Sequence, residues 1–249
     1  MFDILDCQVY YISFEPSPLT EKTLRAQNFT NINHVEAIDA RHWDDNRLRE
    51  LVAKNELSLA GYESVRFGRP IWSGFPSTAA LGCTLTHRAC WVNCRPGEII
   101  VIAEDDVRFF RKAQLSDMNK FFQESNAIGV GRVFMCTLKI MNYGTHFYAL
   151  DYAACQTLLT MSLPMEIQLD THIQALGKCG YLTIVNNTNI ATQKLHKSTI
   201  QTVAVRDLVG HYPANIIALS VLVITIIILL VVLKIVFSNC NKMCTKSGK

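Results

Sequence analysis

The sequence predicts an α/β domain with a mostly parallel β-sheet. A β-branched and aromatic run at 7–14 has the composition of a first strand. Ser17 and Pro18 follow it and fit the N-cap and first position of a helix, after which a second strand fits around 34–38. A strand, a helix and a strand in this order form a right-handed crossover between parallel neighbours. The later run at 99–103 is apolar throughout, as is typical of strands buried on both faces of a sheet.

Further elements are predicted by polar N-caps before periodic apolar residues and by short β-branched or aromatic runs. A short helix is expected to start at Asp44 and Asp45, and a longer one is expected over 79–94 with Ser77 or Thr78 as its cap. Three more helices are expected at 116–124, from the N-cap Asp151 to about Met161, and at 171–177. The further expected strands are 131–138, 144–150 and 181–185. The segment 56–77 holds three glycines and two prolines, so we expect a long loop there. Its Trp72 and Phe75 could stack on a sugar or base, or could anchor the loop.

Three acids, Glu104, Asp105 and Asp106, directly follow the apolar strand. The carboxyl end of a strand is where open α/β sheets bind ligands. Adjacent carboxylates repel one another unless a cation lies among them, and hard oxygen ligands suit Mg²⁺ or Mn²⁺, which commonly bridge phosphates. The triplet therefore predicts a divalent ion that holds a diphosphate, and the alternative is a solvated turn or a helix N-terminus.

The helix expected at 79–94 carries Cys83, His87, Cys90 and Cys94 on one face. At a rise of ~1.5 Å per residue, the first and last of these lie about 16 Å apart. A tetrahedral ion needs every ligand within ~2.3 Å, so at most two of the four can share one ion. We therefore expect the small thiols to pack in the core.

The stretch 82–110 resembles the signature of glycosyltransferase family 25, which includes bacterial lipopolysaccharide galactosyltransferases and procollagen galactosyltransferases. The family pattern is a Gly-Cys, a Ser-His, a Trp, an apolar strand and Glu-Asp-Asp. The matching residues here are Gly82, Cys83, His87, Trp91, Glu104, Asp105 and Asp106, with Thr86 keeping the hydroxyl of the usual serine. A second block of the family is matched by Gly144, Tyr148, Leu150, Ala154 and Leu158, and the resemblance extends over about 7–200.

This resemblance implies a nucleotide-sugar-binding domain similar to the GT-A fold. It implies inverting transfer of a hexose, galactose first and glucose second, from a UDP-sugar donor to a hydroxyl of a protein or glycan acceptor, with Mn²⁺ or Mg²⁺ as cofactor. The implied donor-binding residues are Glu104, Asp105, His87 and Asp39; the implied metal ligands are Asp106, Glu104 and His196; the implied acceptor-activating base is Asp170.

Each outlying site residue also has a structural alternative. Asp39 could cap a turn, Asp170 could be the N-cap of the helix at 171–177, and His87 could be a satisfied core histidine. His196 could be a surface residue. Two other functions are compatible with this sequence. One is a catalytically inactive, membrane-anchored binding or structural protein derived from such an enzyme, and the other is a metal-dependent phosphohydrolase.

The segment 216–237 is predicted to be a transmembrane helix. It carries no charge before Lys234, and 22 residues at ~1.5 Å make about 33 Å, enough to span the hydrocarbon of a bilayer. The predicted organisation is a glycosyltransferase-like domain at 1–205, a linker at 206–215, the helix at 216–237 and a short basic tail at 238–249. Four of the 24 basic residues are lysines of 216–249, so residues 1–215 hold 20 basic and 21 acidic residues. A domain this close to neutral is not expected to bind nucleic acid.

The topology signals conflict. Four lysines beyond the apolar core of the predicted span favour a cytosolic tail by the positive-inside bias. The N-terminus lacks a cationic signal region, which favours single-pass insertion by the C-terminal anchor with the domain in the cytosol, and we adopt this orientation. The luminal alternative would expose sequons at Asn28 and Asn186. Nine cysteines, an odd number without regular spacing, indicate mostly reduced thiols.

Overall fold

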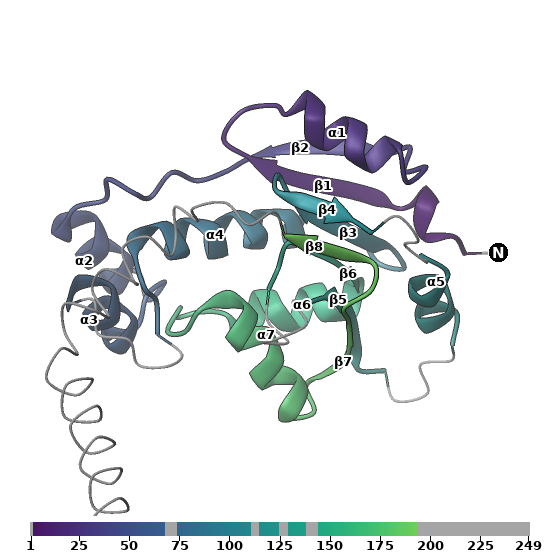
Figure 1. Ribbon diagram of the computed structural model, residues 1–249. Helices are drawn as coiled ribbons and strands as arrows, with labels where there is room; N and C mark the ends of the chain where they lie inside the picture. Colours follow the sequence, from purple (N-terminus) through teal and green to yellow (C-terminus); the bar gives the residue numbers. More distant parts are fainter. Residues whose placement is uncertain (1, 68–73, 111–114, 125–128, 138–143, 194–249) are drawn as a thin grey trace, which may run out of the picture. The chain divides into compact units, whose positions relative to one another are not determined.

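A six-stranded sheet forms the centre of the fold in the computed structural model (Figure 1). The structure describes residues 2–67, 74–110, 115–124, 129–137 and 144–193. The strand order is β2-β1-β3-β6-β5-β7, and only β6 runs against its neighbours, so the predicted mostly parallel sheet is confirmed. The strands are β1 (Gln8–Ser13), β2 (Ile32–Glu36), β3 (Ile99–Glu104), β5 (Gly131–Cys136), β6 (Phe147–Asp151) and β7 (Leu182–Asn187).

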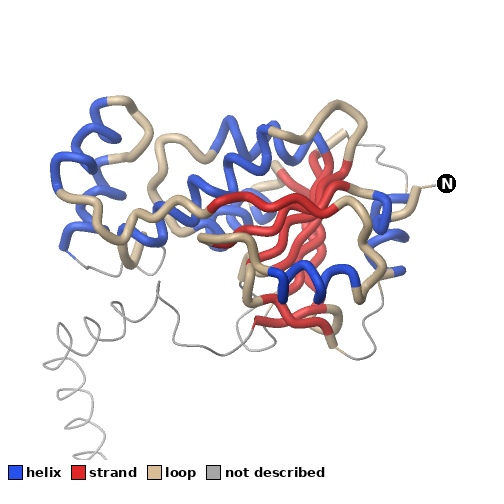
Figure 2. Tube along the Cα trace, turned by 90° about the horizontal axis from the view of Figure 1, so that it is seen from above, coloured by secondary structure: helices blue, strands red, loops and turns tan. Residues whose placement is uncertain are grey.

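Helices cover both faces of this sheet, as Figure 2 shows from above. One face packs on α4, α6 and α7, and the other on the N-terminal 3-10 turn, α1 and α5. A third apolar cluster joins α2, α3 and the start of α4. The helices are α1 (Pro18–Arg25), α2 (Asp45–Ala53), α3 (Leu59–Phe67), α4 (Thr78–Val92), α5 (Ser116–Gln123), α6 (Tyr152–Met161) and α7 (Leu169–Lys178).

The predicted N-caps are confirmed by side-chain hydrogen bonds at four helices. Ser17, Asp44, Ser77 and Asp151 each accept a hydrogen bond from the backbone N–H three residues later. Each bond satisfies one of the amide donors that the first turn of a helix leaves without an intrahelical partner. These caps explain why α1, α2, α4 and α6 begin where the sequence predicts.

The prediction of an irregular loop over 56–77 was wrong for its first half. Helix α3 occupies Leu59–Phe67, and Ser58 caps it by accepting a hydrogen bond from the Gly61 N–H. Gly61 faces a crowded neighbour: a Cβ there would lie 2.6 Å from the carbonyl oxygen of Met165. This glycine therefore serves close packing rather than a turn. Phe75 is fully buried, which confirms its anchoring role, whereas Trp72 lies outside the described residues.

Two short strands that the sequence patterns do not predict form a second, two-stranded sheet. β4 (Val107–Phe109) pairs antiparallel with β8 (Ala191–Gln193), and Val107 stands opposite Gln193. This small sheet brings a late segment of the chain beside the acids at the end of β3.

The predictions for the C-terminal part of the chain lie outside the described residues. They comprise His196, the linker at 206–215, the transmembrane helix at 216–237 and the tail at 238–249. Within the described ranges, no helix combines the length and the apolar character that a membrane span requires.

Candidate active site

The site lies where the central strand β3 ends. Glu104 is the last residue of that strand, pairs in register with Ile12 of β1, and donates its backbone N–H to the carbonyl of His146 at 2.9 Å. Its side chain is 19% exposed, so the carboxylate is close to solvent without being surrounded by it. Asp105 is exposed and Asp106 half-buried in the turn between β3 and β4.

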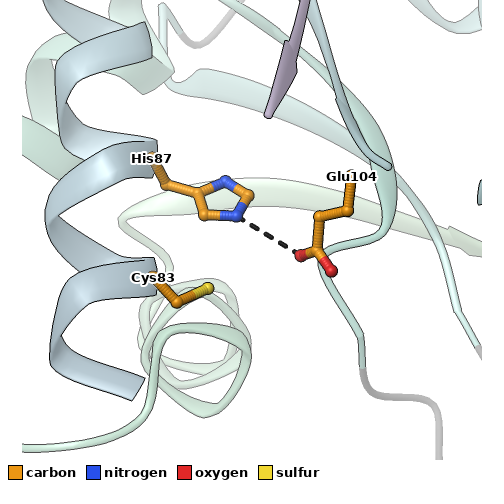
Figure 3. Close-up of side chains that lie close together, drawn as sticks. All are labelled: Cys83, His87 and Glu104. Atoms are coloured by element: carbon orange, nitrogen blue, oxygen red, sulfur yellow. Dashed lines mark ion pairs between the residues drawn. The ribbon is translucent and has the colours of Figure 1, made fainter. Parts of the chain in front are cut away.

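Helix α4 presents two side chains to this carboxylate (Figure 3). Cys83 and His87 lie one helical turn apart, and their Sγ and ring nitrogen lie with a Glu104 oxygen inside a group of atoms no more than 4.8 Å apart. Nε2 of His87 is 3.3 Å from Oε1 of Glu104, at ion-pair distance. His87 is fully buried, and its Nε2 has no hydrogen-bond partner among the described residues.

Two residues of the helix explain how α4 comes this close to the sheet. A Cβ on Gly82 would lie 2.4 Å from the carbonyl oxygen of Ile38, so only glycine permits the observed approach of the segment after β2. Thr86 then ties the two together: its hydroxyl accepts the Ile38 N–H at 2.9 Å and donates to the Gly82 carbonyl at 2.8 Å. The hydroxyl that Thr86 shares with serine is thus a structural link.

A chain of buried polar contacts leads from Trp91 to Glu104. Trp91 donates its indole N–H to the Tyr148 hydroxyl at 3.0 Å, and that hydroxyl is hydrogen-bonded to Nδ1 of His87 at 2.8 Å. Trp91, His87 and Tyr148 are all fully buried. On the other side, the Thr145 hydroxyl donates to Oε1 of Glu104 at 2.6 Å. Glu104 is therefore held in place by contacts from α4 and from the segment that leads into β6.

The carboxyl groups have divergent pKa values because they crowd one another. Burial works against the charged form of Glu104, but the charge of His87 at 3.3 Å and the hydrogen bond from Thr145 hold the pKa of Glu104 below its usual range. Burial and the Glu104 charge raise the pKa of Asp106 to about 6. The same two causes raise the pKa of Asp105. Oδ1 of Asp106 is also buried without a hydrogen-bond partner in the described part of the chain.

Asp170 feels the charge of Glu104, and the alternative that it is the N-cap of the helix at 171–177 was wrong. Helix α7 begins at Leu169 with Gln168 as N-cap, so Asp170 lies inside the first turn rather than at the cap. Its Oδ1 accepts the Thr171 N–H at 2.7 Å. Burial raises the pKa of Asp170, and the charge of Glu104 raises it further.

The charges of three acids act on the thiol of Cys83. After burial, the causes that raise the pKa of the Cys83 thiol are the charges of Glu104, Asp170 and Asp106, in that order. The structure thus brings Cys83, His87 and Glu104 together, with donor atoms within 4.8 Å of one another, and the charges of Asp170 and Asp106 also act on the Cys83 thiol. The expectation that this thiol packs in the core was wrong, since Cys83 is half-buried at the site, whereas Cys90 and Cys94 do lie in the core.

Asp39 is not joined to this group by any contact of the described residues. Its exposed carboxylate pairs with Arg41 through two hydrogen bonds of 2.7 and 2.6 Å. These bonds lower the pKa of Asp39 to about 2. The Arg41 guanidinium in turn lies 4.6 Å from the centre of the Phe14 ring.

Three further residues of the site were not predicted as site residues: Tyr148, Thr145 and His146. Tyr148 matched a family block, but nothing local indicated its contact with α4. Thr145 and His146 precede a strand whose antiparallel pairing with β3 brings them beside Glu104. Both ring nitrogens of His146 are buried without a hydrogen-bond partner in the described residues, and burial lowers its pKa.

A cavity of about 300 Å³ adjoins the elements that carry Cys83 and Asp170. Thr84 lines it from α4, and Leu169 and His172 line it from α7, on either side of Asp170 in the chain. The segment between α6 and α7 supplies most of the remaining wall, including Ser162 and Glu166. The cavity therefore combines apolar and hydrogen-bonding groups.

Comparison with known proteins assigns no family. No protein-family model matches the chain, and no curated protein matches it. One similar solved structure is that of a candidate glucose-1-phosphate thymidylyltransferase from Bacillus anthracis in complex with sucrose. The match covers 80% of this chain and 94% of that one, at 13% sequence identity and a TM-score of 0.38. That similarity is too low to transfer a function.

Proposed function

We propose that this protein is a divalent-metal-dependent glycosyltransferase. It moves a hexose, galactose first and glucose second, from a UDP-sugar to a hydroxyl of a protein or glycan acceptor, with inversion at the anomeric carbon. The resemblance of 82–110 to glycosyltransferase family 25 supports this proposal. The structure adds a second observation: residues that carry the resemblance lie around one partly buried carboxylate, that of Glu104, at the carboxyl end of a central strand.

The observation that carries the proposal is the state of Asp106. Its Oδ1 is buried without a partner in the described residues, and the Glu104 charge helps raise its pKa to about 6. Bringing a cation to these two carboxylates would relieve both the missing contact and the repulsion. Asp106 and Glu104 therefore fit a Mn²⁺ or Mg²⁺ ion, and His196 stays a sequence prediction as a further ligand. When bound, such an ion supplies positive charge to a departing diphosphate.

Glu104 and Asp170 take distinct roles in this proposal. Glu104 is held by Thr145, by His87 and by its own backbone bond, which suits a group that positions a donor rather than one that moves a proton. Asp170 has a raised pKa, and Leu169 and His172, which are close to it in the chain, line the cavity; this suits a base that removes the proton of an acceptor hydroxyl. Asp105 and Asp39 remain proposed donor contacts at the exposed side.

The proposal includes the C-terminal anchor at 216–237, with the domain on the cytosolic side of the membrane. The support for the anchor is the uncharged length of that segment. The proposed sugar transfer does not depend on the side of the membrane on which the domain lies.

The test is donor turnover by the full-length chain in detergent. The chain is incubated with Mn²⁺ and a panel of UDP-sugars, and UDP release is measured beside the variants Asp106→Asn and Glu63→Gln. Glu63 is an exposed acid on α3 and is the matched control. Release from one donor, lost in Asp106→Asn and kept in Glu63→Gln, is the expected result.

Two other results would replace the proposal. If no donor is hydrolysed and none binds by calorimetry, the non-catalytic, membrane-anchored protein becomes the better description. If phosphate is released from simple phosphate esters without any sugar acceptor, the same carboxylates serve a phosphohydrolase.

A further inference from the structure

The proposed function gives no role to the thiol of Cys83, although that thiol lies in the middle of the site. The Cys83 Sγ, the His87 Nε2 and a Glu104 oxygen form a set of three different donor types within 4.8 Å. We propose that these three side chains bind a borderline-soft divalent ion of the zinc class, at a position distinct from the Asp106 carboxylate that suits Mn²⁺.

Donor chemistry separates the two positions. Thiolate and imidazole ligands favour Zn²⁺, whereas sites for Mg²⁺ or Mn²⁺ are built from carboxylate and other oxygen ligands. Cys83 and His87 supply the first kind from α4, and Asp106 supplies the second kind from the turn after β3. Glu104 lies between them and is the ligand that the two positions share.

The spacing of the donors fits one ion after a small adjustment. Cys83 and His87 are four residues apart on α4, so both side chains face the same side of the helix. A tetrahedral ion with bonds of about 2.0–2.3 Å keeps its ligand atoms roughly 3.3–3.7 Å apart. The His87 to Glu104 distance of 3.3 Å already meets that value, and a group no wider than 4.8 Å reaches it by side-chain movements of about 1 Å.

Nε2 of His87 is positioned to bind a cation together with Glu104 and Cys83. Nε2 is fully buried and faces Glu104 and Cys83, yet among the described residues no hydrogen bond reaches it. With Nδ1–H donating to the Tyr148 hydroxyl at 2.8 Å, the Nε2 lone pair is directed at the cluster. Metal-bound histidines usually have such a partner on the other ring nitrogen, which fixes the tautomer and the ring orientation.

Three protein ligands leave the fourth position of a tetrahedral ion open. That open position is the feature that separates reactive or exchangeable zinc sites from closed structural ones. The charges of Asp170 and Asp106 act on the Cys83 thiol in addition to that of Glu104, so a bound cation would be favoured electrostatically at this position. Binding converts the Cys83 thiol to a thiolate, and the released proton leaves to solvent.

Cobalt titration of the reduced, metal-free full-length chain tests this proposal, because Co²⁺ occupies zinc sites and reports its ligands by colour. We expect one equivalent of Co²⁺ to produce a thiolate-to-cobalt charge-transfer band and tetrahedral d–d bands, both removed by Zn²⁺. Cys83→Ser should lose the charge-transfer band. Cys90→Ala is the matched control and should keep it, since Cys90 lies two turns further along the same helix in the apolar core.

Two more variants separate this proposal from the glycosyltransferase proposal. Tyr148→Phe should weaken Co²⁺ binding by about 10- to 100-fold, because it removes the partner of Nδ1 while leaving all three ligands. Asp106→Asn should keep the cobalt bands even where it abolishes Mn²⁺-dependent UDP release. If the wild type releases no UDP, the glycosyltransferase proposal fails and the cobalt titration still tests the zinc-class site. If the wild type gives no cobalt band, the zinc-class site fails and the glycosyltransferase proposal still stands.

The proposal is overturned if excess Co²⁺ gives the wild type no charge-transfer band, or if the band survives in Cys83→Ser. Near-ultraviolet circular dichroism checks that each variant keeps native packing. If Cys83→Ser does not fold, His87→Gln takes its place, and an unchanged Co²⁺ affinity in that folded variant counts equally against the site.

Discussion

Tyr148 of β6 and His87 of α4 are joined by a buried hydrogen bond of 2.8 Å, although 61 residues separate them in the chain. The same hydroxyl takes the Trp91 N–H, so one oxygen serves two buried groups from the helix. Since β6 pairs with β3, the contact also fixes the helix relative to the strand that ends in Glu104. This single hydroxyl thereby links packing to the geometry of the site.

Tyr148→Phe is expected to destabilise the protein by about 1–3 kcal/mol, because it leaves buried polar groups of His87 and Trp91 without their partner. Urea unfolding measures the change. Tyr181→Phe is the matched control: Tyr181 is 53% exposed, and its substitution should stay within about 0.5 kcal/mol. Equal effects of the two substitutions would show that the hydroxyl contributes nothing to stability.

Thr86 offers a pair of substitutions that separates its hydroxyl from its size. Thr86→Val keeps the shape but leaves the Ile38 N–H without its acceptor, so a loss of about 1–3 kcal/mol is expected. Thr86→Ser keeps the hydroxyl and removes one methyl group, which costs about 0.8 kcal/mol. Urea unfolding of both variants decides the matter. A valine variant as stable as the serine variant would mean that the link between α4 and the segment after β2 is dispensable.

The parts of this fold that local patterns determine could be predicted. Ser17 and Asp151 cap helices where expected because an N-cap acts within three residues of itself. The buried strand before Glu104 was equally visible, since its residues are apolar on both faces. Helix α3 was missed because Gly61 carries a turn signal, and its real role depends on Met165, about a hundred residues away in the chain.

The contacts that shape the site are also distant in sequence and could not be predicted. The bond of Thr145 to Glu104 follows from the pairing of β3 with β6, and the position of Gln193 near Asp106 follows from the pairing of β4 with β8. Neither pairing has a signal in the local composition. The three acids could be predicted as site residues because they directly follow one strand. His87, Thr145 and Gln193, which lower the pKa values of Glu104 and Asp106, come from distant parts of the chain.

Asp106→Asn is expected to stabilise the metal-free protein at pH 7. The folded-state pKa of Asp106 is raised to about 6, above the unfolded value of 3.8, so the folded protein binds more protons than the unfolded chain between these values. Stability at this group therefore falls as pH rises from about 4 to about 6, and the deprotonated carboxylate remains unfavourable at pH 7. Removing the charge should recover roughly 1–2 kcal/mol after allowance for solvent screening.

Urea unfolding in the presence of a chelator, at pH 4 and at pH 7, measures this effect. The gain should be present at pH 7 and absent at pH 4, where the wild-type carboxyl is protonated in the folded state. Glu63→Gln, the exposed control on α3, should change stability by less than about 0.5 kcal/mol at both pH values. An asparagine variant that is less stable than the wild type at pH 7 would contradict the assigned repulsion. Mn²⁺ should reverse the order, because only the wild type gains from the ion.

Asp170→Asn is expected to separate chemistry from donor binding. If Asp170 removes the acceptor proton, its loss should lower kcat for sugar transfer by about 10²- to 10⁴-fold while the Kd for the UDP-sugar changes little. Because burial and the Glu104 charge raise the pKa of Asp170, wild-type kcat should fall as pH drops through that raised pKa, since the protonated acid cannot act as a base. Transfer kinetics across a pH series, with calorimetry for the donor, provide both readouts.

The matched control is Asp117→Asn, which changes an acid in the first turn of another helix, α5. Both substitutions remove a carboxylate from a helix N-terminus, which loses about 0.3–1 kcal/mol of favourable interaction with the helix dipole. At Asp170 the substitution also removes the burial of a charge and its repulsion by Glu104, which acts in the opposite direction on stability. Only Asp170→Asn should lose the rate and the acidic limb of the pH profile. If the two variants transfer sugar at the same rate, or if Asp170→Asn loses donor affinity in proportion to its rate, Asp170 is not the base. The carboxylate in the first turn of α7 would then serve the helix or the donor, and the base must be sought among other residues.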